Sequence, residues 1–394
     1  MNEYNKPICV CGITTRYSTA KVMVDGFEFL NKNGFKTFII CEPNDAMEAL
    51  LKDKNIEYIP IAMKAGRVSI FEIIRQIRAF RNIFRKYKFD IIQYASSNAS
   101  LYASIAGKQE RIKIRILCQW GLTYLGFKGI KRFVYKLAEK ITCRFSTNVQ
   151  PDSHSNLEFA IKEHLFKRKK GNVIWNGSAC GIDFERFDIS KKEAWRKQLF
   201  KKYALPDNAL VFGFVGRIVK DKGVNELLEA FNSAISLKSN IYLFVVGSED
   251  GVFELDKGIL TKAKNNKNIV FTGPINNVPE HYGLFDYVVM PSYREGFSMV
   301  LLESAAMGVP VLSSNICGSL DFVKNDHNGF VFDVKSSSSL CDTILKAYSI
   351  SKDLYKALSS NAFNEAKSYY DIKKFREYYL EDRRSLVKAL KPYD

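Results

Sequence analysis

Two glutamates eight positions apart lie in the stretch 290–314, which reads MPSYREGFSMVLLESAAMGVPVLSS. The pattern predicts a buried strand that ends at Met290, a polar turn that holds Glu295, and a short apolar helix from about Ser298. Glu303 then falls about one and a half turns inside this helix. Carboxylates accept hydrogen bonds from hydroxyl groups, so the pair can hold a ligand at two separate points.

The residues between the two glutamates favour an anion. Gly296 lets the backbone approach a ligand closely, and the N–H groups of Phe297, Ser298 and Met299 lie at the predicted helix start, where negative charge is stabilised. A ligand with hydroxyls at both ends and phosphate between them, such as a nucleotide-sugar, has this layout. The alternative is an ordinary strand–turn–helix whose acidic residues are solvated or cap the helix.

The run EGFSMVLLE, with Ser292 before it and the tail Ala-Met-Gly-Val-Pro-Val after it, resembles the E-x7-E element of retaining glycosyltransferases of family 4. These enzymes have the α/β GT-B fold, with two Rossmann-like domains facing a central cleft. The resemblance implies that Glu295 contacts the donor sugar and Glu303 the nucleotide ribose. It also implies a place in the branch that builds bacterial surface polysaccharides.

A second group of candidate residues follows the predicted strand Leu210–Val215. Arg217 and Lys222 stand on a glycine-containing loop that opens a helix, and such a loop suits a diphosphate. Lone loop cations are usually solvated, but the loop resembles the G-R…K-G element of the family. The resemblance implies donor-phosphate contacts for Gly216, Arg217 and Lys222. It further implies that backbone groups of the turn at Gly273 and Ile275 hold the base.

Strands and helices alternate along the chain, which predicts parallel sheets covered by helices. A chain of 394 residues exceeds the size of one core. We expect domains at 1–187 and 188–371, with a helix from about 372 to 394 that returns to the first domain. Val173–Trp175 is the predicted last strand of that domain. Ligands bind beyond the carboxyl ends of such strands, so the loop from Gly12 to Thr19 is expected to face the cleft, with Gly12 among the donor contacts.

Where many relatives carry a histidine before a glycine, this chain has Gln119-Trp120-Gly121. We expect Gln119 and Trp120 to contact the acceptor or the donor sugar instead. The segment 69–87 predicts an amphipathic helix whose apolar face includes Ile70, Ile74, Phe80 and Phe84.

The net charge of +17 is uneven, because residues 1–190 hold 31 Lys and Arg against 18 Asp and Glu, an excess of 13. A basic excess suits nucleic acid, an anionic membrane surface or a polyanionic substrate, or it is a solvated face. Basic and aromatic residues also mix over 124–140, which suits a membrane interface or a lipid diphosphate and equally single-stranded nucleic acid. We expect a lipid-linked or glycan acceptor and an anionic membrane surface as partners, and no nucleic acid.

The eight cysteines show no C-x-x-C pair, which indicates reduced thiols and a cytoplasmic protein. No run of about 18 apolar residues predicts a membrane span, and the first residues lack the pattern of a signal peptide. No Asp-x-Asp pair occurs at the expected ligand loops, so we predict catalysis without a metal or other cofactor.

Three functions are compatible with these features. The first is a retaining hexosyl- or N-acetylhexosaminyltransferase that uses a nucleotide-sugar, with UDP the commonest nucleotide in the family, and acts at the inner face of the cell membrane. The second is a nucleotide-sugar epimerase on the same fold, which would not need the Glu295/Glu303 pair. The third is a non-catalytic binder of an anionic polymer, which predicts binding with steep salt dependence. The paired glutamates favour the first.

Overall fold

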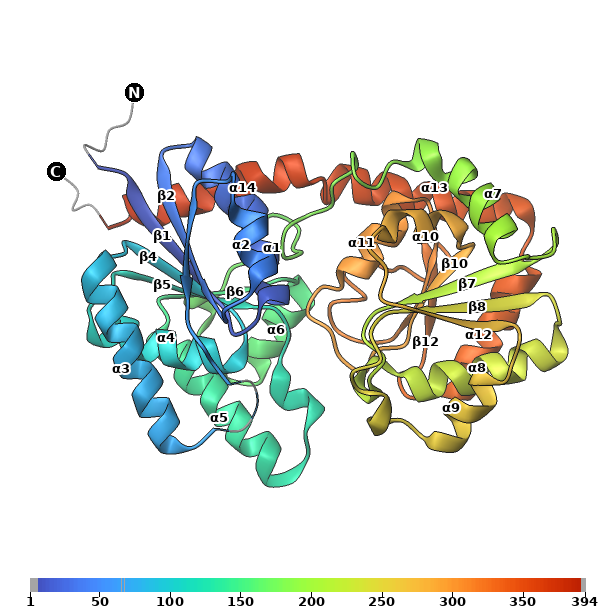
Figure 1. The fold of residues 1–394 in the computed structure, drawn as a ribbon, viewed down its shortest axis with the longest axis horizontal. Coiled ribbons are helices and arrows are strands. Elements are labelled where there is room, and N and C mark those ends of the chain that lie inside the picture. Colours follow the sequence, from blue (N-terminus) through green and yellow to red (C-terminus); the bar gives the residue numbers. More distant parts are fainter. Residues whose placement is uncertain (1–5, 65, 67, 391–394) are drawn as a thin grey trace. The chain divides into compact units, whose positions relative to one another are not determined.

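The computed structural model describes residues 6–64, 66 and 68–390, and it divides into two compact units (Figure 1). Unit 1 comprises the chain up to Cys180 together with the segment from Lys373, and unit 2 comprises Gly181–Ile372. Each unit is described by itself. The first division lies seven positions before the expected 187/188 boundary, and the second lies close to the expected start of the C-terminal helix.

Unit 1 is built on a sheet of six strands within the described residues, in the order β3-β2-β1-β4-β5-β6. All neighbouring strands are parallel. Their carboxyl ends therefore lie at one edge of the sheet. The strands are β1 (Ile8–Ile13), β2 (Phe35–Cys41), β3 (Ile56–Pro60), β4 (Ile91–Tyr94), β5 (Ile114–Gln119) and β6 (Asn148–Pro151).

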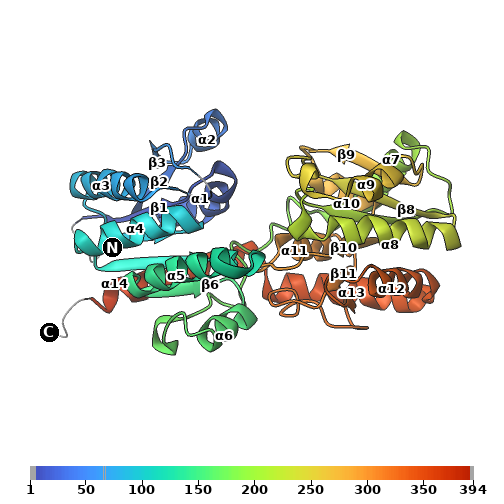
Figure 2. The same ribbon diagram turned by 90° about the horizontal axis from the view of Figure 1, so that it is seen from below.

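Helices cover both faces of this sheet (Figure 2). One face packs against α3 (Ile70–Tyr87), α4 (Ser97–Gln109) and α5 (Gly129–Phe145). The other packs against α1 (Tyr17–Lys32), α2 (Asp45–Leu51) and α14 (Ile372–Lys388). Successive strand side chains point to opposite faces, so Cys11 joins the first core and Val10 the second. The short helix α6 (His154–Lys162) follows β6.

The C-terminal helix α14 is fixed to this sheet by a buried arginine. The guanidinium of Arg383 is 0% exposed and donates to the side-chain carbonyls of Gln93 on β4 at 2.9 Å and Gln150 on β6 at 3.0 Å. It also pairs with Asp382, and the Tyr379 hydroxyl donates to Gln93 at 2.7 Å. Buried polar groups are stabilising only when they are bonded in this way, so the network specifies where α14 sits.

Unit 2 repeats the architecture, with strands in the order β12-β11-β10-β7-β8-β9 within the described chain, all parallel to their neighbours. Helices α7, α10, α11 and α13 pack on one face and α8, α9 and α12 on the other. The strands are β7 (Leu210–Val215), β8 (Ile241–Val246), β9 (Ile269–Gly273), β10 (Tyr287–Met290), β11 (Val311–Ser314) and β12 (Gly329–Phe332). The helices are α7 (Lys192–Lys202), α8 (Val224–Leu237), α9 (Lys257–Lys264), α10 (Val278–Leu284), α11 (Met299–Ala306), α12 (Ser337–Ser349) and α13 (Lys352–Tyr369).

The strand predicted at Val173–Trp175 is wrong. The last strand of unit 1 is β6, and the later segment contributes only a single bridge, between Gly171 and Val149. Trp175 has a φ of 50°, a left-handed conformation that ends any strand. Its indole instead stacks on Tyr378 of α14, with ring centroids 5.4 Å apart.

The predicted apolar face of α3 is wrong at its beginning. Phe80 and Phe84 are buried, as expected, but Ile70 is 62% and Ile74 42% exposed. The helix has 18 residues and is about 27 Å long, whereas the four residues of β4 span about 13 Å. The first turns of α3 therefore extend beyond the core that its second half covers.

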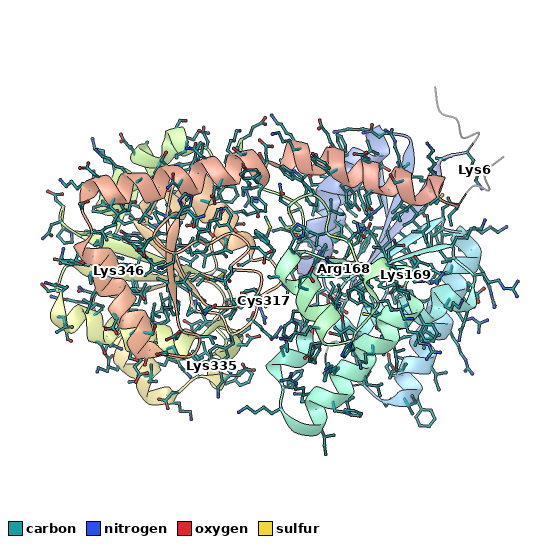
Figure 3. All side chains as sticks on the ribbon, turned by 180° about the vertical axis from the view of Figure 1, so that it is seen from behind. Lys6, Arg168, Lys169, Cys317, Lys335 and Lys346 are labelled. Carbon is teal, nitrogen blue, oxygen red and sulfur yellow. The ribbon has the colours of Figure 1, made fainter. Side chains whose placement is uncertain are left out.

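The basic run 167–170 has two different roles. Arg168 and Lys169 are exposed on unit 1 (Figure 3). Lys170 instead donates to the carbonyl oxygens of Cys143, Arg144 and Ser146 at 2.8–3.1 Å, where a cation stabilises the C-terminus of α5. Among the described residues, none of the helices is both long and apolar enough to cross a membrane.

We predict that Arg383→Ala destabilises unit 1 by about 3–5 kcal/mol, because it leaves buried partners without their donor. Urea unfolding followed by tryptophan fluorescence in a Trp195→Phe background measures this, since the remaining Trp120 and Trp175 both lie in unit 1. The neighbouring, exposed Arg384 is the matched control, and Arg384→Ala is expected to change little. Equal effects of the two substitutions would contradict the anchoring role.

Candidate active site

Glu295 lies on the loop between β10 and α11, where Lys222 and Ser292 contact its carboxylate. The Lys222 ammonium forms an ion pair with Oε1, and the Ser292 hydroxyl donates to the same oxygen at 2.7 Å. Ser292 is buried, and its carbonyl accepts from the Ser314 hydroxyl of β11 at 2.6 Å. The side chain of Glu295 is 14% exposed and that of Lys222 25%. The carboxylate is therefore fixed in place yet reachable from solvent.

Consecutive residues of this loop also contact the loop that carries Lys222. The Tyr293 amide donates to the Asp221 carbonyl oxygen at 2.9 Å, and its hydroxyl donates to Glu226 of α8 at 2.6 Å. Arg294 donates to the Asp221 carboxylate at 2.8 Å. The two loops that hold the predicted sugar and phosphate contacts thus form one connected unit.

A glycine makes this close approach possible. Gly223, between the short 3₁₀ turn Lys220–Lys222 and α8, has a φ of 70°, and a Cβ there would lie 2.0 Å from the Pro291 carbonyl oxygen. A side chain at this position would be strained by the backbone conformation and would also push the loops apart.

Glu303 lies on α11 and accepts a hydrogen bond from the Tyr282 hydroxyl of α10 at 2.8 Å. Tyr282 is 0% exposed. Burial, together with the neighbouring Glu303 carboxylate, raises the pKa of Tyr282 well above its usual value. The phenol of Tyr282 therefore keeps its proton, and by donating it in a hydrogen bond it orients the Glu303 carboxylate.

The remaining predicted donor residues of unit 2 lie around the same sheet edge. Gly216 and the exposed Arg217 follow β7. Gly273 ends β9, and a Cβ there would meet nothing within 4 Å; the half-buried Ile275 follows it. These positions follow the carboxyl ends of neighbouring strands, where a ligand is expected.

The start of α11 combines buried and polar groups. Ser298 is the N-cap and makes no side-chain hydrogen bond to the first turn, which holds no acidic residue. The Phe297 ring is buried against Tyr370, with centroids 5.1 Å apart. Gly296 precedes it on the loop, and Met299 is the first helical residue. The side chain of Phe297 therefore serves the core, and a ligand contact from it would come from its backbone.

In unit 1, Gly12 lies inside β1, and a Cβ there would fall 2.7 Å from the Met23 sulfur and 2.9 Å from the Phe27 ring. This glycine lets α1 pack closely on the strand. Gln119 is 2% exposed and donates to Glu139 of α5 at 2.6 Å. Burial raises the pKa of that carboxyl. Gln119 thus has a partner inside the unit, and its acceptor contact stays a prediction.

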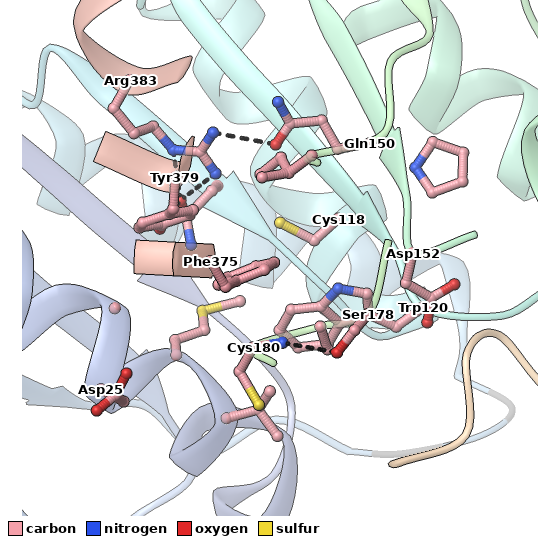
Figure 4. A pocket seen from close by; sticks show the side chains of 17 residues that line it. Asp25, Cys118, Trp120, Gln150, Asp152, Ser178, Cys180, Phe375, Tyr379 and Arg383 are labelled. Carbon is pink, nitrogen blue, oxygen red and sulfur yellow. Dashed lines mark hydrogen bonds between the residues drawn. The ribbon is translucent and has the colours of Figure 1, made fainter. Parts of the chain in front are cut away.

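Trp120 is half-buried and lines a cavity of unit 1 (Figure 4). The cavity is bounded by α1, α14 and the sheet face between them, and it reaches the carboxyl ends of β5 and β6. Polar and aromatic side chains share its wall, among them Asp25, Asp152, Ser178, Phe375 and Tyr379. Trp120 therefore forms part of the wall of this cavity, and its contact with an acceptor or a donor sugar stays a prediction.

Two family models match this chain, one in each unit. The model of the glycosyl transferases group 1 matches residues 196–365, and that of the glycosyl transferase 4-like proteins matches residues 8–153. The capsular polysaccharide biosynthesis glycosyltransferase CapM of Staphylococcus aureus is 31% identical over 337 residues, 85% of this chain and 86% of that protein. The chain belongs to glycosyltransferase family 4.

Two further proteins resemble this glycosyltransferase over most of its length. One is the Escherichia coli UDP-Gal:alpha-D-GlcNAc-diphosphoundecaprenol alpha-1,3-galactosyltransferase, which is 24% identical over 90% of each chain. The other is a solved structure, Anabaena Alr3699/HepE in complex with UDP and glucose. It has a TM-score of 0.76 at 18% identity and covers 96% of this chain and 100% of that one. The second likeness shows the GT-B fold, as predicted.

Sequence reasoning missed Tyr282, Asp221 and Arg294. Each makes its contact to a residue distant in sequence, and a tyrosine or an ion-pairing residue in a loop gives no periodic signal. Tyr282 stands in the mixed run PEHYGLFD, which gives no signal of burial, although a hydroxyl that is buried requires a partner. That partner, Glu303, is visible only in the fold.

We predict that Tyr282→Phe weakens donor binding by about two- to tenfold, because Glu303 loses a hydrogen bond worth about 0.5–1.5 kcal/mol. The effect is expected in KM for the donor, with kcat nearly unchanged. Tyr287→Phe is the matched control. Tyr287 is nearly as buried as Tyr282, and its hydroxyl donates to the Ala347 carbonyl at 3.1 Å, away from Glu303. A KM equal to that of the unsubstituted enzyme would contradict the orienting role.

Proposed function

We propose that this glycosyltransferase moves a hexosyl or N-acetylhexosaminyl group from a UDP-sugar to a hydroxyl of a lipid-linked or glycan acceptor, with retention of anomeric configuration. The single observation that carries the proposal is the Glu295 carboxylate, held by Lys222 and Ser292 directly before α11. A fixed carboxylate next to a cation and a helix N-terminus suits a sugar that is bonded to a diphosphate.

Charge development explains how these groups would accelerate transfer. The bond between the anomeric carbon and the diphosphate oxygen breaks, and a bond to the acceptor oxygen forms on the same face. The acceptor hydroxyl passes its proton to an oxygen of the departing diphosphate. The departing diphosphate gains negative charge, which Arg217, Lys222 and the start of α11 would stabilise most in the transition state. One such donor typically contributes about 2.7–4 kcal/mol. Glu295 orients the sugar ring.

The charges of the site support transfer without a metal ion. Lys222 and Arg217 supply fixed positive charge at the loop, and the first N–H groups of α11 add a partial one. These groups can neutralise a leaving diphosphate, which is the task that a divalent cation has in other transferases. We therefore propose that no metal or other cofactor takes part.

The relatives support the donor and acceptor classes. The Escherichia coli enzyme is named for a UDP-linked sugar and a diphosphoundecaprenol acceptor, and the Anabaena structure holds UDP and glucose. We propose the same classes here, in the synthesis of a capsule, lipopolysaccharide or exopolysaccharide. A lipid-linked acceptor implies peripheral contact with the cytoplasmic face of the cell membrane. The epimerase and polymer-binding hypotheses lose support from the family match.

We predict that UDP raises the melting temperature and that GDP and ADP do so much less. A ligand at 100 times its dissociation constant adds about 2.7 kcal/mol to the free energy of unfolding, which differential scanning fluorimetry detects. Lys222→Met is expected to remove most of this shift, and the exposed neighbour Lys220→Met is the matched control. A shift with none of the nucleotides would argue against the donor assignment.

We predict that Glu295→Gln abolishes transfer while leaving the melting temperature within a few degrees, because the amide keeps the shape but loses the charge. Transfer to a short-chain lipid diphosphate-sugar, with the product linkage read by NMR, tests retention in the same experiment. An inverted linkage would refute the retaining mechanism.

We predict that EDTA leaves the rate of transfer unchanged. Inhibition by EDTA that added Mg²⁺ reverses would refute metal independence.

A further inference from the structure

Exposed apolar side chains gather at the starts of two helices of unit 1. On α5, Ile130 is 84% and Phe133 68% exposed, and on α3, Phe71 is 81% exposed. Soluble proteins rarely leave several large apolar side chains together in water. We call the following set the apolar patch: Ile70, Phe71, Ile74, Ile130, Phe133, Val134 and Leu137.

The topology brings the two halves of the patch to one end of the unit. Helices α3 and α5 both pack against α4, which lies between them. Each connects two parallel strands, so each runs opposite to the strands and begins at their carboxyl edge. Figure 1 shows both helices beginning on the lower side of unit 1. The patch therefore lies at the same sheet edge as Trp120, which directly follows β5.

Cations flank the apolar side chains on α5. Lys128, Lys131, Arg132 and Lys140 are all exposed. The Lys131 ammonium lies 3.9 Å from the centroid of the Phe127 ring. Apolar side chains surrounded by cations suit the interface of an anionic bilayer, where the apolar groups enter and the charges meet the phosphates.

The local sequence at the start of α5 is unfavourable for an isolated helix. Its N-cap, Lys128, makes no side-chain hydrogen bond, and its first turn holds no acidic residue. Cations at a helix N-terminus oppose the helix dipole. Helix α3, by contrast, has a Ser69 cap and Glu72 in its first turn. A helix start that lowers stability in this way indicates a function. Anionic headgroups bound at the start of α5 would offset the cost.

We infer that the apolar patch and its flanking cations dock unit 1 onto an anionic membrane surface, with the first turns of α5 inserted into the headgroup region. A second copy of this chain is the poorer occupant, because a symmetric contact would bring the same cations face to face. The inference rests on the proposed lipid-linked acceptor: docking in this way sets the acceptor edge of unit 1 against the bilayer that holds the lipid.

Flotation of the full chain with vesicles tests the docking surface directly. The protein is expected to bind vesicles of mixed phosphatidylglycerol and phosphatidylcholine, and to bind phosphatidylcholine alone weakly. Ile130→Ser with Phe133→Ser should lower the partition coefficient by about tenfold or more. Phe253→Ser is the matched control, since that side chain is 82% exposed in unit 2. Unchanged binding of the double variant would overturn the inference.

A second pair of variants tests the charges. Lys131→Gln with Arg132→Gln should weaken binding to the anionic vesicles and flatten its salt dependence. Lys167→Gln with Lys169→Gln removes the same charge from a different exposed stretch and should have a smaller effect. Equal losses in the two double variants would mean a diffuse charge effect and would refute a localised cationic surface.

Two readouts separate this inference from the proposed function. With a short-chain, water-soluble acceptor, the Ile130/Phe133 variant should keep the full transfer rate, and with acceptor in vesicles its rate should fall. If no acceptor is glycosylated, the proposed function fails while flotation still decides the docking surface. Sedimentation analysis gives the remaining outcome: dimerisation that Ile130→Ser with Phe133→Ser abolishes would assign the patch to a second copy and overturn membrane docking.

Discussion

The parallel direction of the strands is the constraint on which the functional features depend. When every strand runs the same way, each connection must cross back by a helix, and all carboxyl ends meet at one edge. In unit 2 this edge gathers Arg217, Gly273 and Glu295 from three separate strand ends. In unit 1 it gathers Trp120 and the starts of α3 and α5. The topology of the parallel sheet thus brings these residues to one edge, and contacts between side chains then fix their exact positions.

Within unit 2, the refinement consists of joining two loops. The Glu295–Lys222 ion pair alone would be a weak constraint, because partly exposed pairs contribute little. The Asp221–Arg294 and Glu226–Tyr293 contacts, and the approach of Gly223 to Pro291, fix the same two loops from further points. A group held by several independent contacts needs little reorganisation when its ligand arrives. Such preorganisation is what electrostatic catalysis requires.

Much of the fold is readable from the sequence, because continuous apolar runs between turn residues predict buried parallel strands. The predicted strand Leu210–Val215 and the predicted strand end at Met290 match β7 and β10 of the structure. Strand β6, with the sequence NVQP, lacks such an apolar run, since it is short and holds polar residues and a proline. The segment Val173–Trp175 is apolar, yet it is not a strand. Pairing along a sheet is a tertiary property that a run of four residues does not encode.

The site residues also differ in how far the sequence predicts them. Glu295, Glu303, Lys222 and Arg217 stand in motifs whose spacing is local, so the sequence predicts them together. Tyr282, Arg294 and the buried Arg383 act through partners far along the chain. Arg383 shows the limit well, because it lies in the charged run EDRRS, where the residue type predicts exposure. Only the packing of α14 against Gln93 and Gln150 buries it.

The exposed start of α3 shows that a periodic pattern can be correct in its period and wrong in its consequence. Ile70 and Ile74 continue the apolar stripe that Phe80 and Phe84 follow into the core, so the period predicts burial for all four. The helix is longer than the sheet beneath it, and the stripe continues past the point where the protein can cover it. An apolar stripe that outlasts its core has a cost in water. That cost is removed if the apolar part of a bilayer covers the stripe. Because the start of α5 at the same edge is uncapped and cationic, it favours a bilayer with anionic headgroups.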